Sequence, residues 1–287
     1  MITRRWERIT VALPSDYQDL LIGHLALAGV KGFLQDEHGV TFYLPERLWS
    51  GNMKTRILRV VHDYQREFPR LDLSVTTRFV RDQNWNRLWE RQTGIVAATP
   101  NILIKPSWQR LPRRDRNKII LHIDPKMSFG TGHHETTRLS LRVMEQYFGE
   151  ARRVLDFGCG TGVLAIAAAK LGAHRVLAID NDSWSTINAR ENVRRNRVER
   201  CVKVVEGGRS KIPRAAFDLI VANIDYLAIT RCLPALAKRL SSASLLILSG
   251  LLESDLSLLK SHFDRLNLRL VNIDQEHEWA ALVLRKV

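Results

Sequence analysis

The pattern of hydrophobic and polar positions divides the chain into two parts. In the first 80 residues, strand-like alternation and helix-like spacing follow one another in the order β-α-β-β-α-β. We expect strands at residues 6–13, 32–36, 40–44 and 71–80, and helices at 20–28 and 53–68. This order predicts a small ferredoxin-like α+β domain over residues 1–78. A helical linker, residues 79–98, follows it, with Trp85, Leu88 and Trp89 on one side.

From residue 99 onward, apolar strands alternate with helical segments, which is typical of an α/β fold around a mostly parallel sheet. A helix is expected from Ser183, which offers a serine N-cap, to Asn196. The last two strands, 268–273 and 279–285, are joined so closely that they must be antiparallel. Residues 99–287 are therefore predicted to form a second, larger domain.

A glycine-rich turn, Asp156-Phe-Gly158-Cys-Gly160-Thr-Gly162, joins one of these strands to an alanine-rich helix. Glycines allow positive φ and a close approach of the backbone to a ligand. A carboxylate two residues before the first glycine is unfavourable for a pyrophosphate but favourable for a cation, such as the sulfonium and ammonium of S-adenosylmethionine. The next strand ends in Asp180, where a ribose-binding carboxylate lies in such folds. The alternative is a tight strand–helix turn without a ligand.

A second glycine-rich loop, residues 124–137, follows the strand at 119–123. It contains Phe129 and Thr131 and ends at Thr136 and Thr137, whose hydroxyls are expected to cap the next helix. Adjacent His133 and His134 do not form a metal site by themselves, because neighbouring side chains rarely converge on one ion. We expect no bound metal, and we expect a histidine of this loop to lie over a ligand.

The strand at 216–224 ends in Asn223. Ligands of doubly wound sheets bind at the carboxyl ends of the strands, so Asn223 is expected beside Asp156 and Asp180. Its amide can hydrogen-bond an amine or a carboxylate. Asp225 follows, either as a helix N-cap or as a proton acceptor.

Composition narrows the class of protein. No apolar run reaches the roughly 18 residues of a membrane span, and the N-terminus lacks the apolar core of a signal peptide. Cys159, Cys201 and Cys232 form neither a disulfide framework nor a zinc ligand set, so we expect a cytoplasmic protein. The oligomeric state is not determined by the sequence, and we expect a monomer.

The formal net charge of +14 is concentrated in the middle of the chain. Residues 91–210 hold 21 basic and 11 acidic side chains, a balance of +10, whereas residues 1–90 and 211–287 each have a balance of +2. A basic surface over residues 91–210 would attract nucleic acid, including ribosomal RNA, or would simply be solvated.

Four motifs together resemble one family. They are Asp124-Pro-x-x-x-Phe-Gly-Thr-Gly-x-His-x-Thr-Thr137, the glycine-rich turn at 156–162, Ala-Ile-Asp180 and Ala-Asn223-Ile224. The chain resembles the bacterial ribosomal protein L11 methyltransferase (PrmA) family over nearly its whole length. It departs from that family where Asp225 and Tyr226 follow Asn223-Ile224 instead of Leu-Ala-x-Pro.

The resemblance implies a class I methyltransferase: a Rossmann-like α/β domain with a mostly parallel seven-stranded sheet and an antiparallel C-terminal strand, preceded by the ferredoxin-like domain. It implies methyl transfer from S-adenosylmethionine to lysine ε-amines and the N-terminal amine of a ribosomal protein, which the N-terminal domain recognises. The cofactor-binding residues expected from the motifs and the resemblance are Phe129, Thr131, Thr137, Asp156, Gly158, Gly160, Gly162, Asp180 and Asn223. Asn223 and Asp225 are the expected catalytic residues.

Two other functions are consistent with parts of the pattern. One is methylation of RNA, or of another protein, at nitrogen. Enzymes that methylate base amines typically have Asn-Pro-Pro-Tyr at the fourth strand, where this chain has Asn223-Ile-Asp-Tyr226. The other is a non-catalytic module that binds S-adenosylmethionine, which the intact glycines and acids disfavour.

Overall fold

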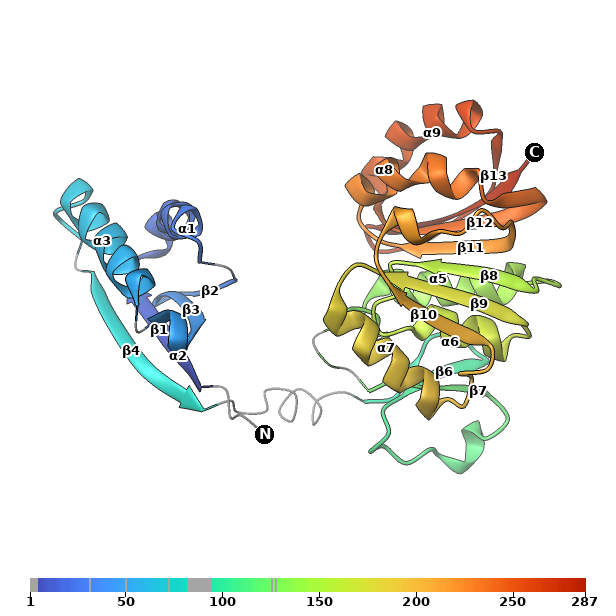
Figure 1. The fold of residues 1–287 in the computed structure, drawn as a ribbon, viewed down its shortest axis with the longest axis horizontal. Coiled ribbons are helices and arrows are strands. Elements are labelled where there is room, and N and C mark those ends of the chain that lie inside the picture. The colour runs from blue at the N-terminus through green and yellow to red at the C-terminus, as the bar shows by residue number, and fades with distance from the viewer. Residues whose placement is uncertain are drawn as a thin grey trace. The chain divides into compact units, whose positions relative to one another are not determined.

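The computed structural model describes residues 5–30, 32–49, 51–71, 73–81, 94–124, 126 and 128–287. The chain forms two compact units, Met1–Trp85 and Asn86–Val287 (Figure 1). The predicted helical linker, with Trp85, Leu88 and Trp89, falls mainly on residues 82–93, outside the described residues. Its two ends are strands, since β4 (Ser74–Arg81) reaches Arg81 and β5 (Val96–Ala97) pairs with a later strand.

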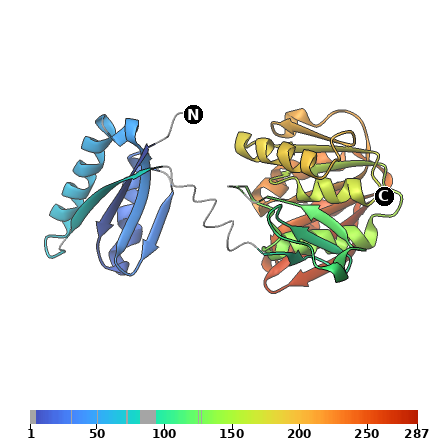
Figure 2. The same cartoon turned by 90° about the horizontal axis from the view of Figure 1, so that it is seen from below.

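The first unit is an antiparallel sheet with the predicted ferredoxin-like order of elements. Its strand order is β2-β3-β1-β4. Helices α1 and α3 pack on one sheet face through a single hydrophobic core, and α3 is seen along the sheet in Figure 2. The elements are β1 (Arg5–Ala12), α1 (Gln18–Leu27), β2 (Phe33–Asp36), β3 (Gly39–Pro45), the short α2 (Glu46–Trp49), α3 (Asn52–Glu67) and β4.

The second unit is a three-layer α/β structure. A seven-stranded sheet has the order β10-β9-β8-β11-β12-β14-β13, in which β14 is antiparallel to both of its neighbours. The first five strands in this order are parallel, as predicted. The bounds are α5 (Glu135–Tyr147), β8 (Arg153–Phe157), α6 (Val163–Lys170), β9 (Arg175–Asp180), α7 (Ser183–Arg195), β10 (Val202–Glu206), β11 (Phe217–Asn223), α8 (Tyr226–Ala237), β12 (Leu240–Leu252), α9 (Leu256–Arg265), β13 (Leu268–Glu276) and β14 (Trp279–Lys286).

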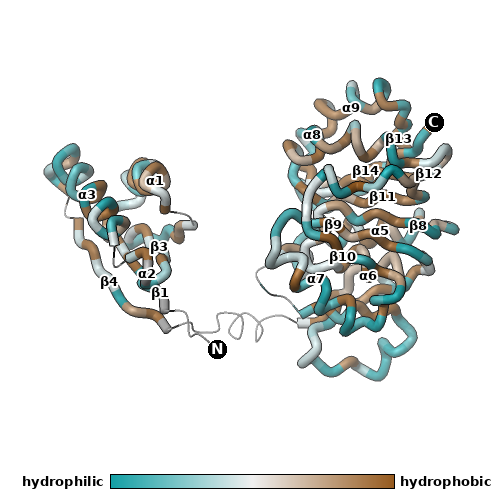
Figure 3. Tube along the Cα trace, viewed as in Figure 1, coloured by the Kyte–Doolittle hydropathy of each residue, from teal (hydrophilic) through white to brown (hydrophobic). Residues whose placement is uncertain are grey.

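Two hydrophobic cores cover the two faces of this sheet. One face packs against α5, α6 and α7, and the other against α8 and α9. The central strands β8 and β11 are buried on both faces, so their sequences are nearly continuous apolar runs, seen as brown segments in Figure 3. Burial on both sides leaves the strand ends as the places where polar side chains can act.

The strand predicted at 119–123 is present as β7 (Ile119–His122), but the small additional sheet to which it belongs was not predicted. Its strands are β5, β6 (Ile102–Lys105) and β7 in the order β5-β6-β7. It packs on α6 and α7: the Asn196 amide group bonds both the backbone N–H and the carbonyl of His122. This sheet fixes the point from which the loop at 124–134 crosses to the main sheet.

Two predicted N-caps are wrong. Residues Ser15–Tyr17 form a short 3₁₀ turn, and α1 begins without a side-chain cap. Helix α5 is capped by His134 and not by the threonines, and α7 is capped by Asp182 and not by Ser183.

In the described part of the chain, no helix has the length and apolar character that crossing a bilayer requires.

Candidate active site

The turn between β8 and α6 depends on its glycines. Gly158, Gly160 and Gly162 have φ angles of 79°, 53° and 80°. A Cβ atom at Gly158 would lie 2.3 Å from the Ile224 side chain, and one at Gly160 would lie 2.4 Å from the Phe129 carbonyl oxygen. Any larger residue would therefore push apart the segments that meet at this edge of the sheet.

Asp180, at the end of β9, is held by two backbone amides. Its two carboxylate oxygens accept hydrogen bonds from Gly160 N (2.8 Å) and from Asp182 N (2.9 Å). The first of these bonds ties the carboxylate to the glycine turn, and Asp182 in turn caps α7 through Ser185 N. The position of Asp180 is thus set before any ligand binds, and each oxygen keeps a second lone pair for a ligand hydroxyl.

The loop that contains Phe129 and Gly130 is docked on the glycine turn. Thr161 donates its backbone N–H to the Phe129 carbonyl (2.8 Å) and its hydroxyl to the Gly130 carbonyl (2.7 Å). A Cβ atom at Gly130 would lie 2.7 Å from the Thr161 hydroxyl oxygen. Both glycine-rich segments found in the sequence therefore form one contact and depend on each other's small residues.

Three aromatic rings form a row beside this contact. The ring centroids of Phe129 and His134 are 5.2 Å apart, and those of His134 and Trp279 are 4.9 Å apart. Nδ1 of His134 lies 2.9 Å from the Thr136 hydroxyl and accepts a hydrogen bond from Thr136 N, which fixes the ring at the start of α5. Phe129 is half exposed, so one end of the row faces solvent.

The end of β11 contributes an amide and a second acid. Asn223 is 8% exposed, and its side-chain amide oxygen has no hydrogen-bond partner among the described residues. Asp225 is exposed and accepts a hydrogen bond from Ala228 N (2.9 Å), so it is the N-cap of α8. Of the two roles considered for Asp225, the capping role is present in the structure.

These groups line a cavity of about 420 Å³ at the carboxyl ends of the strands. It is lined by Phe129, His134, Thr136, Gly158, Gly160, Asp180, Asn181, Ser185, Asn223, Ile224, Asp225, Gly250 and Trp279. The lining contains two carboxylates and neither lysine nor arginine. A pocket of this composition favours a cationic ligand over a phosphate.

The structure brings six of the predicted site residues to the cavity and leaves four outside its lining. Phe129, Gly158, Gly160, Asp180, Asn223 and Asp225 line it. Thr137 and Asp156 are buried beneath it, Thr131 is half-buried in the loop, and Gly162 packs against Ala189. Sequence reasoning did not select Trp279 or Gly250, which come from β14 and β12, far along the chain from the motifs.

Asp156 has a structural role. It is fully buried, and one carboxylate oxygen accepts a hydrogen bond from Ala165 N (2.9 Å) in the first turn of α6. Burial above all raises the pKa of this carboxyl to about 7; nearby Asp180 also raises it, and the Ala165 hydrogen bond lowers it. The acid of the glycine motif therefore holds α6 against β8 and does not face the cavity.

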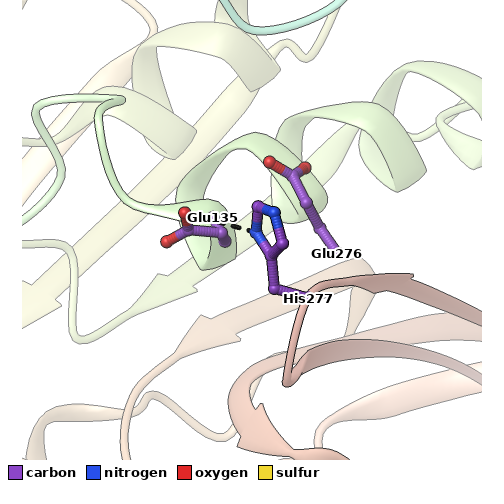
Figure 4. Close-up of side chains that lie close together, drawn as sticks. All are labelled: Glu135, Glu276 and His277. Atoms are coloured by element: carbon purple, nitrogen blue, oxygen red, sulfur yellow. Dashed lines mark ion pairs between the residues drawn. The ribbon is translucent and has the colours of Figure 1, made fainter.

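A group of possible metal ligands lies next to the aromatic row. Ligand atoms of Glu135, Glu276 and His277 lie within 4.8 Å of one another, with Glu135 on α5 and the other two at the β13–β14 turn (Figure 4). Arg138 already bonds both carboxylates, at 3.2 Å from Glu135 and more closely to Glu276, and Arg142 lies 3.5 Å from Glu276. Two guanidinium groups supply the positive charge that a metal would bring, so this cluster is an ion-pair network that ties the turn carrying Trp279 to α5.

Comparisons with known proteins agree on one family. A family model described as ribosomal protein L11 methyltransferase (PrmA) matches residues 30–287. A protein of Chlorobaculum tepidum named ribosomal protein L11 methyltransferase is 36% identical over 278 residues, which cover 95% of this chain and 93% of that protein. One of the same name from Pelotomaculum thermopropionicum is 35% identical and covers 85% of this chain and 78% of its own.

A solved structure agrees with the fold. The crystal structure of a ribosomal protein L11 methylase from Lactobacillus delbrueckii subsp. bulgaricus matches with a TM-score of 0.63 and 28% identity. The match covers 68% of this chain and the whole of that one.

The raised pKa of Asp156 predicts a pH dependence of stability. Its native pKa, about 7, lies above the unfolded value of about 3.9, so the native state binds the proton more tightly. The resulting stabilisation is complete below about pH 4 and is lost as the pH rises through about 7. Between pH 5 and 8, we expect the free energy of unfolding of the unmodified protein to fall by roughly 2–3 kcal/mol relative to Asp156→Asn.

Urea unfolding at several pH values measures this difference. Asp16→Asn, at an exposed position in the first unit, is the control. Its free energy of unfolding, plotted against pH, should run parallel to that of the unmodified protein. Parallel curves for Asp156→Asn as well would show that Asp156 does not carry the titration.

Proposed function

We propose that this chain, which belongs to the ribosomal protein L11 methyltransferase (PrmA) family, transfers methyl groups from S-adenosylmethionine to amines of ribosomal protein L11. The acceptors are lysine ε-amines, the N-terminal amine, or both. One observation supports the cofactor above all: a preset carboxylate, Asp180, faces a cavity with no lysine or arginine in its lining. We expect the reaction in the cytoplasm, where ribosomal proteins are made, and the three cysteines are free thiols.

The residues present fit S-adenosylmethionine on chemical grounds. The free lone pairs of Asp180 suit the two ribose hydroxyls, and the unpartnered amide oxygen of Asn223 suits an ammonium N–H. The cofactor supplies an electrophilic methyl group on a sulfonium, with a thioether as the leaving group. Asp180, Asn223 and the backbone of Gly158 and Gly160 would hold it, whereas Asp156, Thr137 and Gly162 would act indirectly by fixing these segments.

The acceptor amine must be neutral and in line when it attacks the methyl group. A lysine amine has an unperturbed pKa of about 10.4, so it has to lose a proton before its nitrogen lone pair can attack. Transfer to a partly desolvated pocket lowers that pKa. We assign Asn223 to orient the amine and Asp225, at the exposed rim, to receive its proton. Positioning of this kind contributes up to roughly 7–11 kcal/mol in favourable reactions.

The aromatic row is the proposed acceptor entrance. Trp279 and His134 line the cavity together with Ile224 and Asp225, and Asn181 and Ser185 also belong to its lining. Aromatic faces attract an alkylammonium, and they pack against the methylene groups of a lysine. The carboxylates of Asp180 and Asp225 in the cavity lining add a negative potential that attracts a basic protein.

Methylation of RNA is the weaker alternative. Asp180, Asp182, Asp225 and Glu253 all lie at or just after the carboxyl ends of the strands around the cavity, and each is at least partly exposed. These carboxylates would repel a phosphate backbone at the cavity. An RNA contact, if one is made, belongs elsewhere on the molecule.

The first prediction of this proposed function concerns the cofactor. Asp180→Ala should weaken S-adenosylmethionine binding about tenfold or more in calorimetry, because hydrogen bonds to a charged group contribute about 1.5–3 kcal/mol. Asp16→Ala, at an exposed position in the first unit and outside the cavity lining, is the control. Equal affinity in the two variants would contradict the role of Asp180.

A second prediction concerns the first unit, which we propose selects the protein substrate. A chain that starts at Gly94 keeps β5 and all later strands. It should keep a folded circular dichroism spectrum and bind S-adenosylmethionine, but lose methyl transfer to ribosomal protein L11. Full transfer by the shortened chain would show that the first unit plays no part in recognition.

A third prediction concerns Trp279. Trp279→Ala should lower kcat/KM for the protein substrate by about tenfold or more, since an aromatic contact to a cation in a partly desolvated site contributes about 1–2 kcal/mol. Trp279→Phe keeps a ring at this position and should retain most of the activity. Cofactor affinity, measured by calorimetry, should change less than activity in both variants. An alanine variant that matches the phenylalanine variant would argue against the aromatic entrance.

A further inference from the structure

A row of arginines lies at the sheet edge opposite the cavity, where the parallel strands start. An arginine lies at or just before the start of each of the five parallel strands: Arg153 for β8, Arg175 for β9, Arg200 for β10, Arg214 for β11 and Arg239 for β12. All but Arg239 are exposed, and Arg239 is partly exposed. Because parallel strands start at the same edge of a sheet, these residues form one row. We call this row, together with its continuation into β13 and β14, the basic edge.

The row continues through the antiparallel strands. Arg269 of β13 is the direct cross-strand partner of Arg285 of β14, and both are exposed. Strand β14 runs in the opposite direction, so its last residues return to the edge where β12 and β13 start. The basic edge thus includes residues outside the basic stretch 91–210 that the sequence analysis identified. Its members are brought together by the topology of the sheet and not by their closeness in the sequence.

Two like-charged pairs lie directly opposite each other in this edge. Arg153 pairs with Arg175 across β8 and β9, and Arg269 pairs with Arg285 across β13 and β14. Within the described residues, none of these four guanidinium groups has a carboxylate partner. Like charges directly opposite one another destabilise a sheet. The fold itself does not require two arginines to face each other in these pairs, and a bound polyanion would relieve the repulsion between their guanidinium groups.

The end of α7 adds charge to the same edge. Arg194 is in the last turn and Arg197 follows it, and both are exposed. A helix dipole accounts for a cation at this end of a helix, but not for the strand arginines beside it. Asp218, an acid at the edge, accepts hydrogen bonds from the backbone N–H groups of Arg152 and Arg153, and this engages its carboxylate.

We propose that the basic edge binds the phosphate backbone of RNA without sequence preference, while the cavity at the opposite edge stays open. Arginine forks match phosphate oxygens, and strands spaced about 4.8 Å apart spread seven such positions over roughly 29 Å, close to one helical turn of a duplex. Among the described residues near this edge, Val287 and Leu270 are the large hydrophobic side chains that are exposed, too little apolar surface for a membrane anchor. The choice of RNA over DNA rests on the proposed function, whereas the phosphate contact does not.

Fluorescence anisotropy with a labelled RNA duplex of about 20 base pairs tests the proposal, over about 50 to 200 mM salt and without S-adenosylmethionine. The test variant combines Arg175→Glu, Arg194→Glu and Arg200→Glu. We expect at least about tenfold weaker binding near 100 mM salt and a slope of log K against log salt that is smaller by about 3. The control combines Arg56→Glu, Arg59→Glu and Arg66→Glu, three exposed positions on α3 with the same change in net charge. The RNA affinity of this control variant should stay within about threefold of that of the unmodified protein.

The single variant Arg175→Glu separates binding from folding. It converts a repulsive pair with Arg153 into an attractive one, so its melting temperature should equal or exceed that of the unmodified protein while RNA binding weakens. Equal weakening in the test and control variants, no salt-dependent binding at about 10 μM protein, or tighter binding to a matched DNA duplex would each overturn the proposal. Methyl transfer to ribosomal protein should persist in the test variant, so failure of the RNA proposal and failure of the proposed reaction give different results.

Discussion

The site depends on a close backbone contact at Gly160. At this residue the glycine turn donates one amide to Asp180, and its neighbour Thr161 donates another to the Phe129 carbonyl. A Cβ atom at Gly160 would lie 2.4 Å from the same carbonyl oxygen. These hydrogen bonds, together with the absence of a side chain at Gly160, bring the glycine turn, the loop that contains Phe129 and the end of β9 within reach of one ligand. The position of Asp180, the docking of the Phe129 loop and the shape of the cavity all follow from this contact.

Two acids of the same type, at the ends of neighbouring strands, have different environments. Asp156 is fully buried under α6, and its pKa is raised to about 7, mainly by burial. Asp180 is partly exposed and accepts two backbone hydrogen bonds at the cavity wall. The strand-end position alone did not distinguish them. The difference arises because the first turn of α6 lies directly over β8 and presents Ala165 N to Asp156.

Patterns between residues close in the sequence predicted the fold and the central residues of the candidate site. Strand and helix periodicity predicted the order of the main strands and helices in both units, and the spacing of Gly158, Gly160 and Asp180 identified part of the cavity wall, whereas Asp156 lies outside it. The caps were less predictable, because His134 and Asp182 outcompete Thr136 and Ser183 through geometry that only the folded loop defines. Trp279 was missed for a different reason. It lies more than a hundred residues from His134, and only the insertion of β14 between β12 and β13 brings the two rings together.

That insertion also has a consequence for the order in which the protein is made. The strand that comes last in the sequence, β14, sits inside the sheet, so β12 and β13 cannot join before it has been synthesised. The first unit has its own core and is free to fold while the rest of the chain is still being translated. The second unit must wait with one edge of β12 unpaired, which is a template for association with other chains. We expect nascent chains at this stage to depend on chaperones, and the wall of the cavity that Trp279 supplies to be completed last.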